Sequence, residues 1–239
     1  MKRSEVNALM RDALAFFQQN NFYLPAFALW TPAEWAAKGP EVSEIVRNEL
    51  GWDLTDYGLD QFQRYGLLLF TLRNGNMIDL RQGYGKPYAE KVAILEVGQT
   101  HQMHYHYRKS EDIINRAGGI LAMELYNAAE DDGLADTPVT VSLDGVVHSL
   151  RAGGIVRLKP GESITLTPRL YHRFWAEGDR VMMGEVSMIN DDKGDNCFYQ
   201  PLGSGRFGTI EEDVEPLYLL FSDYERYWPE AKQLTRQDR

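Results

Sequence analysis

The chain has 239 residues, of which 44% are hydrophobic and 12% aromatic, a composition typical of a folded globular protein and not of a disordered one. The formal net charge of −10 at pH 7 argues against binding to nucleic acid or to an anionic membrane surface. The single cysteine, Cys197, excludes an internal disulfide, and no stretch approaches the roughly 20 apolar residues of a membrane span. We expect a soluble, cytoplasmic protein.

The first 65 residues are expected to form helices. Apolar residues follow helical spacing over residues 6–17, with Ser4 as a candidate N-cap. Thr31-Pro32-Ala33-Glu34 has the pattern of a capping box with proline at the first helical position. A third helix is expected over residues 42–50, ended by Gly51. This pattern predicts a helical N-terminal extension, residues 1–65, that packs on the next domain or mediates dimerisation.

After residue 65 the chain consists of short strand-like runs separated by turn residues. Asn74-Gly75 and Asp144-Gly145 are both signals of a two-residue hairpin turn. Strands are expected at residues 66–73, 91–97, 101–107, 119–127, 137–143, 146–150, 154–158, 163–167, 173–176 and 181–189. Many short, closely spaced strands predict a mainly β fold, a barrel or jelly roll, over residues 66–228. Residues 229–239 are expected to form a polar C-terminal tail.

The most informative motif lies at residues 98–118 and reads G-x(5)-H-x-H-x(4)-E-x(6)-G. In an extended strand, residues i and i+2 point to the same face. His104 and His106 would therefore aim their imidazoles at one point, which Glu111 can reach from the next bend or strand. Two nitrogens and one carboxylate oxygen suit a divalent transition-metal ion, and His172 is the candidate fourth ligand.

The two remaining histidines are not expected to be ligands. His101 is separated from His104 by an odd number of residues, which places it on the opposite face of an extended strand. It is therefore expected at the surface or behind the ligands. His148 lies in the strand predicted at 146–150 and is expected to be exposed.

The spacing of the 98–118 motif matches the first signature motif of the cupin family, so the chain resembles a cupin. A version of the second cupin motif runs from Gly161 through Pro168 to His172. Its Gly-to-Pro interval is one residue longer than usual, its Pro-to-His interval is one shorter, and the intervening glycine is missing. These changes cancel, so His172 keeps its distance from Gly161. The resemblance implies a cupin β-barrel in which His172 joins the three ligands of the first motif.

Three neutral imidazoles and one carboxylate leave two open positions on an octahedral metal ion. Mn²⁺, Fe²⁺, Co²⁺, Ni²⁺ and Zn²⁺ all suit such a donor set. Two adjacent open positions can chelate the vicinal hydroxyl and carbonyl of a sugar, and they can also serve O₂ chemistry. Charged residues near the motif favour the sugar, because a polyhydroxylated ligand needs many hydrogen-bond partners; these residues are Lys91, Lys109, Glu185, Asp195 and Glu211.

Residues 101–113, 184–192 and 206–216 resemble the bacterial D-lyxose isomerase family, and the likeness spans most of the chain. The resemblance implies isomerisation of D-lyxose to D-xylulose, often with D-mannose to D-fructose, supported by Mn²⁺ in a homodimer. In the expected enediol mechanism Glu185 or Glu211 is the base that moves the proton between C2 and C1. Lys109 would steady the developing oxyanion.

Lys91 and Asp195 are the expected substrate-binding groups, and a metal-assisted hydride shift is the rival route to proton transfer. Three rival functions remain open from the sequence. An Fe²⁺-dependent cupin dioxygenase would use the same ligands, and a sugar-sensing or storage cupin would keep only the barrel. A sugar-phosphate isomerase would need a cationic phosphate site, for which Arg169 and Arg173 are the candidates.

Overall fold

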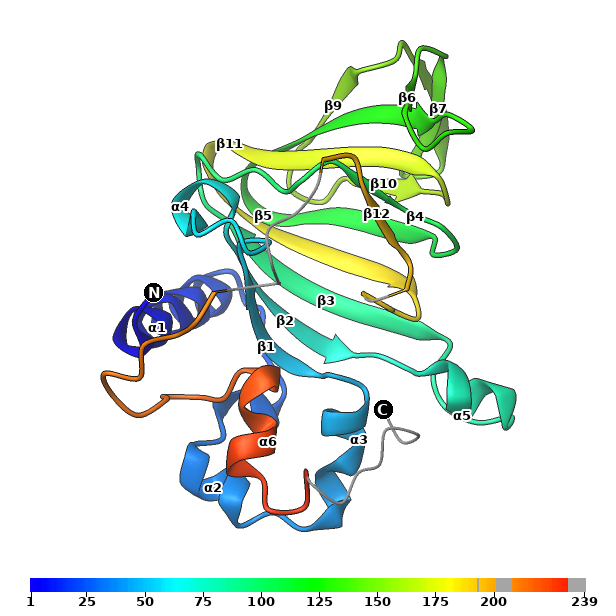
Figure 1. Ribbon diagram of the computed structural model, residues 1–239. Helices are drawn as coiled ribbons and strands as arrows, with labels where there is room; N and C mark the ends of the chain where they lie inside the picture. The colour runs from blue at the N-terminus through cyan, green and yellow to red at the C-terminus, as the bar shows by residue number, and fades with distance from the viewer. Residues whose placement is uncertain (193, 201–207, 232–239) are drawn as a thin grey trace.

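Two long antiparallel strands, β5 (Glu111–Ala128) and β11 (Leu170–Met188), organise the fold of this computed structural model (Figure 1). Their register shifts between Glu177 and Val181, close to Gly118. Gly118 has φ +94°, and a Cβ placed on it would lie 2.0 Å from the carbonyl oxygen of Arg180. Only glycine therefore allows the two strands to bend together at this point. The structure describes residues 1–192, 194–200 and 208–231.

Because β5 and β11 bend, each half pairs with a different neighbour. The first half of β5 pairs with β10 (Ser163–Leu166), and its second half pairs with β9 (Gly154–Leu158). The start of β11 pairs with β4 (His104–His106), and its end pairs with β3 (Tyr88–Leu95). The result is an antiparallel jelly roll, which confirms the predicted mainly β fold.

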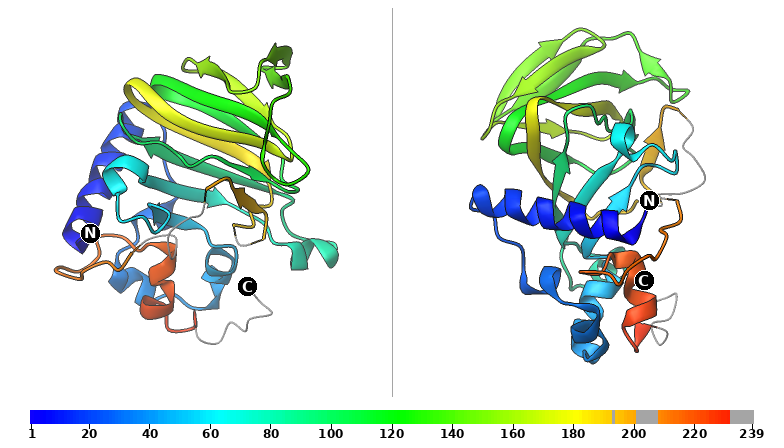
Figure 2. Two further views of the ribbon diagram at one scale, coloured as in Figure 1. Left: turned by 45° about the horizontal axis from the view of Figure 1, so that its top comes forward. Right: turned by 90° about the vertical axis from the view of Figure 1, so that its left-hand side faces the viewer.

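The remaining strands extend this jelly roll on both sides. The main path through the 12-stranded sheet is β1-β2-β3-β11-β5-β10-β7-β8, and β12 joins through β4. The bounds of these strands are β1 Gly51–Thr55, β2 Leu67–Arg73, β6 Leu134–Ala135, β7 Val139–Leu143, β8 Val146–Leu150 and β12 Asn196–Phe198. Figure 2 shows the strands of this sheet curving around a common interior. Its buried lining includes Leu121, Met123, Leu125, Ile164 and Phe174.

The long helix α1 (Arg3–Gln19) covers the outer face of β1, β2 and β3 (Figure 1). It packs Val6, Met10, Ala13 and Phe17 on this face, as its helical spacing predicts. The shorter helical elements are η1 Ala26–Leu29, α2 Pro32–Ala36, η2 Pro40–Val42, α3 Ser43–Arg47, α4 Phe62–Tyr65, α5 Met77–Arg81, η3 Phe221–Asp223 and α6 Tyr224–Tyr227. Of these, α2, α3 and α6 form a separate group below the sheet, and α5 lies at its far end (Figure 1).

The end of the described chain returns to the N-terminal helices. Trp35 of α2 packs with Tyr224 of α6 and with Trp228 in a separate buried cluster. Arg3 is buried and forms ion pairs with Glu212 and Asp223 at 2.7 and 2.9 Å. The helical segment is therefore held both by apolar packing and by contacts with residues more than 200 positions away.

Several local predictions are confirmed. The Thr31–Glu34 capping box is present, with the Glu34 amide donating to the Thr31 side chain. The Asp144-Gly145 hairpin is present with φ +49° and +84°, which are the positive values that this turn requires. Strands 146–150 and 154–158 have the predicted bounds.

Other predictions for the first 80 residues are wrong. Gly51–Thr55 is a strand, β1, although helices alone were expected up to residue 65. Helix α3 ends at Arg47, and Gly51 begins the strand instead of ending a helix. Helix α1 begins at Arg3, so Ser4 lies inside it and binds Asp213 instead of capping the helix. Asn74-Gly75 does not form a two-residue hairpin, because α5 lies between the paired strands β2 and β3.

Two further boundaries differ. The strands expected at 173–176 and 181–189 are parts of the continuous β11. The predicted polar tail begins later than residue 229, because Ala231 is fully buried in the cluster around Trp35. The rest of that predicted tail, residues 232–239, lies outside the described residues.

Replacing Met10 with alanine is expected to destabilise the protein by about 2–5 kcal/mol. Met10 is fully buried between α1 and the sheet, so its loss leaves a cavity in that cluster. Urea unfolding followed by tryptophan fluorescence measures the effect, with the exposed Arg11→Ala on the same helix as a control. Equal unfolding midpoints for the two variants would show that α1 does not support the sheet.

Candidate metal centre

A cavity of about 390 Å³ opens inside the barrel. One part of its wall is polar and contains Lys91, His101, His104, His106, Lys109, Glu111, His172 and Glu185. The other part is largely apolar and contains Leu67, Leu69, Ala93, Ile113, Phe174, Met183 and Phe198. This volume and this mixture are typical of a small-molecule site.

Three histidines converge at the polar wall. His104 and His106 lie two residues apart on β4, and His172 on β11 is the direct strand partner of His104. One ring nitrogen of each residue lies within 4.8 Å of one from each of the others, and all three residues are buried. Strand alternation thus brings the first two together, as predicted, and the pairing of β4 with β11 adds the third.

Hydrogen bonds set the ring orientation of two of these histidines. Nδ1 of His104 donates to the carbonyl of Gln102 at 2.8 Å, and Nδ1 of His172 donates to the carbonyl of Leu170 at 3.0 Å. Because a carbonyl can only accept, these contacts leave each Nε2 with a lone pair. Nε2 of His172 is buried and has no hydrogen-bond partner among the described residues. A buried, unpaired acceptor of this kind is what a metal ion would satisfy.

Glu111 completes the cluster from the start of β5. Its Oε1 lies 3.3 Å from Nε2 of His106 and 3.2 Å from Nε2 of His172. Its Oε2 lies 2.8 Å from Nζ of Lys109. Burial works to raise the pKa of Glu111, but the charge of Lys109 and the contact with His106 hold it well below its ordinary value. The side chain is therefore an ionised donor at neutral pH.

Burial also keeps the imidazoles of His104 and His101 neutral. Desolvation, followed by repulsion from His172, holds the pKa of His104 well below its ordinary value. Desolvation lowers the pKa of His101 to about 3. A neutral imidazole at His104 and an ionised carboxylate at Glu111 are the protonation states that metal ligation requires, and three buried imidazoles with one carboxylate are a donor set that fits a divalent cation.

A second group of charged side chains, Lys91, Lys109 and Glu185, lies beside the histidine cluster. Nζ of Lys109 lies 2.8 Å from Oε1 of Glu185, and Nζ of Lys91 lies 3.4 Å from the same oxygen. Burial works to raise the pKa of Glu185, but the positive charges of Lys109 and Lys91 hold it below its ordinary value. Glu111 and Glu185 likewise hold the pKa of Lys109 above its ordinary value. Glu185 is thus a buried, ionised carboxylate at the cavity wall.

Two residues predicted for the site lie elsewhere. The carboxylate of Asp195 is buried under the turn before Glu111 and accepts from the backbone amides of Arg108 and Lys109 at 2.8 and 3.0 Å. It orders the turn that carries Lys109 and does not line the cavity. Glu211 is exposed beside the start of α1, where its backbone pairs with Met1 and Arg3. Its segment runs along the N-terminus, so its carboxylate is not at the cavity wall.

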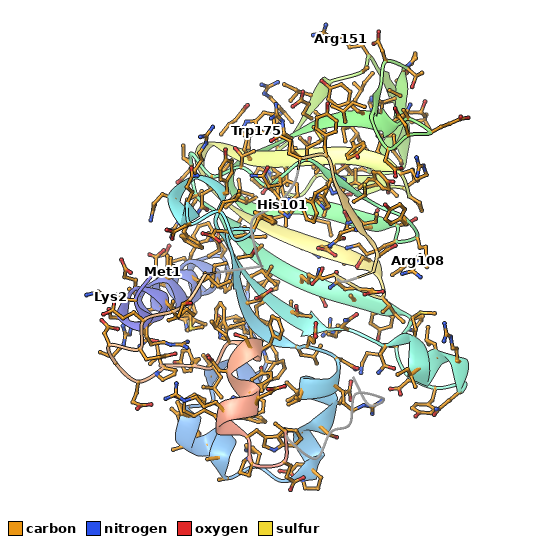
Figure 3. All side chains as sticks on the ribbon, in the orientation of Figure 1. Met1, Lys2, His101, Arg108, Arg151 and Trp175 are labelled. Carbon is orange, nitrogen blue, oxygen red and sulfur yellow. The ribbon has the colours of Figure 1, made fainter. Side chains whose placement is uncertain are left out.

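His101 lies outside the three-histidine cluster and against a ring of that cluster, which agrees with the prediction, but the predicted reason is wrong. Residues 101–103 are not part of β4, so strand alternation does not apply to them. The ring of His101 packs on the rings of His104 and Phe174, with centroids 4.6 and 4.4 Å apart, and it lines the cavity. Figure 3 places His101 within the barrel and Arg108 at its edge. His101 is not a member of the three-histidine cluster.

Two further expectations concern His148 and the two arginines proposed as a phosphate site. His148 is exposed on β8, as predicted. Arg169 binds Asp132 and the Tyr105 hydroxyl, and Arg173 pairs with Glu124. Neither arginine lines the cavity, so neither provides the phosphate site that a sugar-phosphate isomerase would need there.

The sequence analysis missed some residues of the wall. Tyr57 and Phe198 pack near His101 and His104. Tyr57 follows the unpredicted strand β1 and has φ +61°, a conformation that is uncommon for a tyrosine. No sequence pattern identifies such a residue, because the tertiary contacts alone bring it to the cavity.

A jelly-roll barrel whose interior gathers three histidines and a glutamate is a cupin-like arrangement, as the sequence predicts. Over most of its length, 88%, the chain shares its fold with the L-ribose isomerase of Cellulomonas parahominis; the match covers 98% of that chain, with a TM-score of 0.58 and 16% identity. The model of the D-lyxose isomerase family matches residues 1–224. The chain belongs to the D-lyxose isomerase family.

Two curated relatives agree with this membership. The D-lyxose/D-mannose isomerase of Serratia proteamaculans is 49% identical over 231 residues, which cover 95% of this chain and 99% of the relative. The D-lyxose/D-mannose isomerase of Escherichia coli O157:H7 is 45% identical, with 95% and 100% covered. The chain is therefore an aldose–ketose sugar isomerase that acts on a small sugar. Among the described residues, no helix has the length and apolar character needed to cross a membrane.

Proposed function

We propose that this chain converts D-lyxose to D-xylulose, and D-mannose to D-fructose, by proton transfer within the barrel cavity. Both curated relatives carry the name D-lyxose/D-mannose isomerase. The observation that carries the proposed mechanism is the position of Glu185. Lys109 holds this ionised carboxylate at 2.8 Å and also contacts Glu111 of the histidine cluster at 2.8 Å. Lys109 thus contacts both the proposed base, Glu185, and a proposed metal ligand, Glu111.

His104, His106, His172 and Glu111 would hold a divalent cation, which as a Lewis acid would polarise the sugar carbonyl. The unpaired Nε2 of His172 and the outward Nδ1 bonds of His104 and His172 support this assignment. We propose Mn²⁺ as the ion, with Zn²⁺, Co²⁺, Fe²⁺ and Ni²⁺ as competitors for the same nitrogen and oxygen donors.

Glu185 is assigned the proton transfer. Its carboxylate would take the proton from C2 of the aldose and return it to C1, and the hydroxyl proton of O2 would pass to O1, which together give the ketose. Lys109 and Lys91 favour the ionised form of Glu185 before the transfer. When the carboxylate accepts the proton, the ammonium of Lys109 is free to donate a hydrogen bond to the sugar oxygen on which negative charge develops.

The apolar wall supports the same chemistry. Phe174 is buried, and Phe198 stacks on His104 at a centroid distance of 5.3 Å. These rings and the neighbouring leucines exclude water from the reacting carbons. Fewer water molecules strengthen the electrostatic contacts of Lys109 with the reacting groups.

A metal-dependent sugar screen tests the proposed function. The purified protein is stripped with a chelator, reloaded with Mn²⁺, and assayed for ketose formation from pentoses and hexoses. We expect activity on D-lyxose and D-mannose only after reloading. No turnover of either sugar would rule the proposal out, and oxygen uptake by the iron-loaded protein would support the dioxygenase alternative.

Isomerisation in D₂O is expected to place solvent deuterium at C1 of the ketose, because a carboxylate proton exchanges with solvent during some turnovers. Mass spectrometry or NMR of the product measures this incorporation. The rival hydride shift moves the hydrogen without exchange. Complete absence of deuterium at C1 would therefore contradict Glu185 as a proton carrier.

Three finer features belong to the same proposal. They are the Mn²⁺ preference, a homodimer and a cytoplasmic location, all implied by the resemblance and by a metabolic sugar substrate. Metal analysis of protein purified without added ions, light scattering in solution, and fractionation of the cells that produce it would test the three in turn.

A further inference from the structure

The Asn74-Gly75 pair is a turn signal that the structure uses in another way. Asn74 is buried with 6% of its surface exposed, and it follows β2. A Cβ placed on Gly75 would lie 1.7 Å from the carbonyl oxygen of Lys86, so no side chain fits there. The glycine permits close packing, and the asparagine side chain turns toward the segment that follows β11.

The side chain of Asn74 forms hydrogen bonds with both the backbone amide and the backbone carbonyl of Asn190. The amide of Asn190 donates to Oδ1 of Asn74 at 3.0 Å, and Nδ2 of Asn74 donates to the carbonyl of Asn190 at 3.2 Å. Nδ2 of Asn74 also donates to the carbonyl of Asn48 at 3.4 Å, and Nδ2 of Asn48 donates to the carbonyl of Asn74 at 3.0 Å. The position uses both a donor and an acceptor, which an amide supplies on a short side chain.

Asn190 in turn contacts the two lysines of the cavity. Its Oδ1 accepts a hydrogen bond from Nζ of Lys91 and lies 3.5 Å from Nζ of Lys109. The same two ammonium groups lie 3.4 and 2.8 Å from Oε1 of Glu185. Two oxygens, one from an amide and one from a carboxylate, therefore bridge two positive charges. This arrangement fixes the ammonium groups of both lysines at the cavity wall.

We propose that Asn190 and Asn74 are positioning residues for the isomerase reaction: Asn190 orients Lys91 and Lys109 over Glu185, and Asn74 holds Asn190 in place. The inference rests on the roles of Lys109 and Glu185 in the proposed function. It also assigns a task to the helical segment, because Asn48 follows α3 and supports Asn74. The segment before the barrel thus contributes to the reaction site through an asparagine chain.

Four variants separate this role from a general effect on folding. Asn190→Ala removes the amide oxygen that contacts both lysines and leaves their carboxylate partners in place, and we expect kcat to fall about 10- to 100-fold with a smaller change in KM. Asn190→Asp keeps an oxygen at that place and is expected to recover about tenfold or more of that loss. Asn74→Asp turns the donor that faces two carbonyls into an acceptor, so its kcat should fall at least as far as that of Asn190→Ala. Asn127→Ala, an asparagine that bonds Thr137 and Pro138 on the far part of β5, is the control and should keep the wild-type kcat.

A second measurement does not depend on turnover. Labelling with an amine-acylating reagent, read by mass spectrometry, should modify Lys91 several-fold faster in Asn190→Ala than in the wild type, with Mn²⁺ content and melting temperature little changed. Equal labelling rates in the two proteins, or equal kcat losses in Asn190→Ala and Asn190→Asp, would overturn the proposal. If the wild type turned over neither sugar, the proposed function would fail, and the labelling comparison would still decide whether Asn190 positions the lysines.

Discussion

Replacing Glu185 with glutamine is expected to lower kcat for D-lyxose about 10²- to 10⁴-fold, the usual contribution of a positioned general base. Glutamine keeps the shape of the side chain and an oxygen that can accept from Lys109, but it cannot take up a proton. The bound metal should stay at the wild-type level, because Glu185 is not part of the histidine cluster. Steady-state kinetics and metal analysis of the same preparation measure both quantities.

Glu211→Gln is the matched control for this experiment. Glu211 is the other carboxylate that the sequence offers as the base, and it lies exposed beside α1. Its variant should keep the wild-type kcat. A Glu185→Gln protein that retained a tenth or more of the wild-type kcat would show that another group moves the proton.

Replacing His104 with alanine is expected to weaken Mn²⁺ binding by at least about 100-fold and to abolish turnover, because one of four donors is lost. Metal content after dialysis measures the first effect. Thermal unfolding with and without Mn²⁺ gives an independent measure, because a ligand at about 100 times its Kd stabilises the folded state by about 2.7 kcal/mol. That stabilisation should be present in the wild type and missing in the variant.

Two other histidines provide the controls for metal binding. His101 packs against the ring of His104 at 4.6 Å but is outside the three-histidine cluster, so His101→Ala should keep nearly all of the metal. His148 is exposed on β8, and His148→Ala should keep both metal and activity. If His101→Ala lost as much metal as His104→Ala, the assignment of the ligands would be wrong.

Local signals in the sequence were sufficient for the Asp144-Gly145 hairpin and for a strand with one buried and one exposed face. The strand at 154–158 alternates between buried and exposed positions, and its predicted bounds are correct. Strand β1 alternates Trp52 and Leu54 with Asp53 and Thr55, but it has no exposed face, because all five of its residues are buried. A run of only five residues is too short to outweigh the helical signals before it, so the sequence predicts a helical segment there.

The continuous strand β11 also shows that local sequence signals are not sufficient to predict strand ends. Glu177, Gly178, Asp179 and Arg180 have the composition of a turn, so the sequence predicts a break there. The structure instead bends the strand at this point, with a register shift against β5. Whether turn-like residues end a strand or bend it depends on the neighbouring strand, which the local sequence does not contain.

The sequence by itself determined the three-residue core of the candidate metal centre. His104 and His106 meet because backbone alternation is a local property, and Glu111 follows within five residues. The tertiary structure alone decided which of the two candidate base carboxylates, Glu185 or Glu211, lines the cavity. Lys109 and Glu185 are 76 positions apart, and they meet because β11 is paired with β3 and β5 in one register. Asn74 reaches Asn190 across 116 positions for the same reason: pairing between distant strands, and not local spacing, sets which polar groups share the cavity.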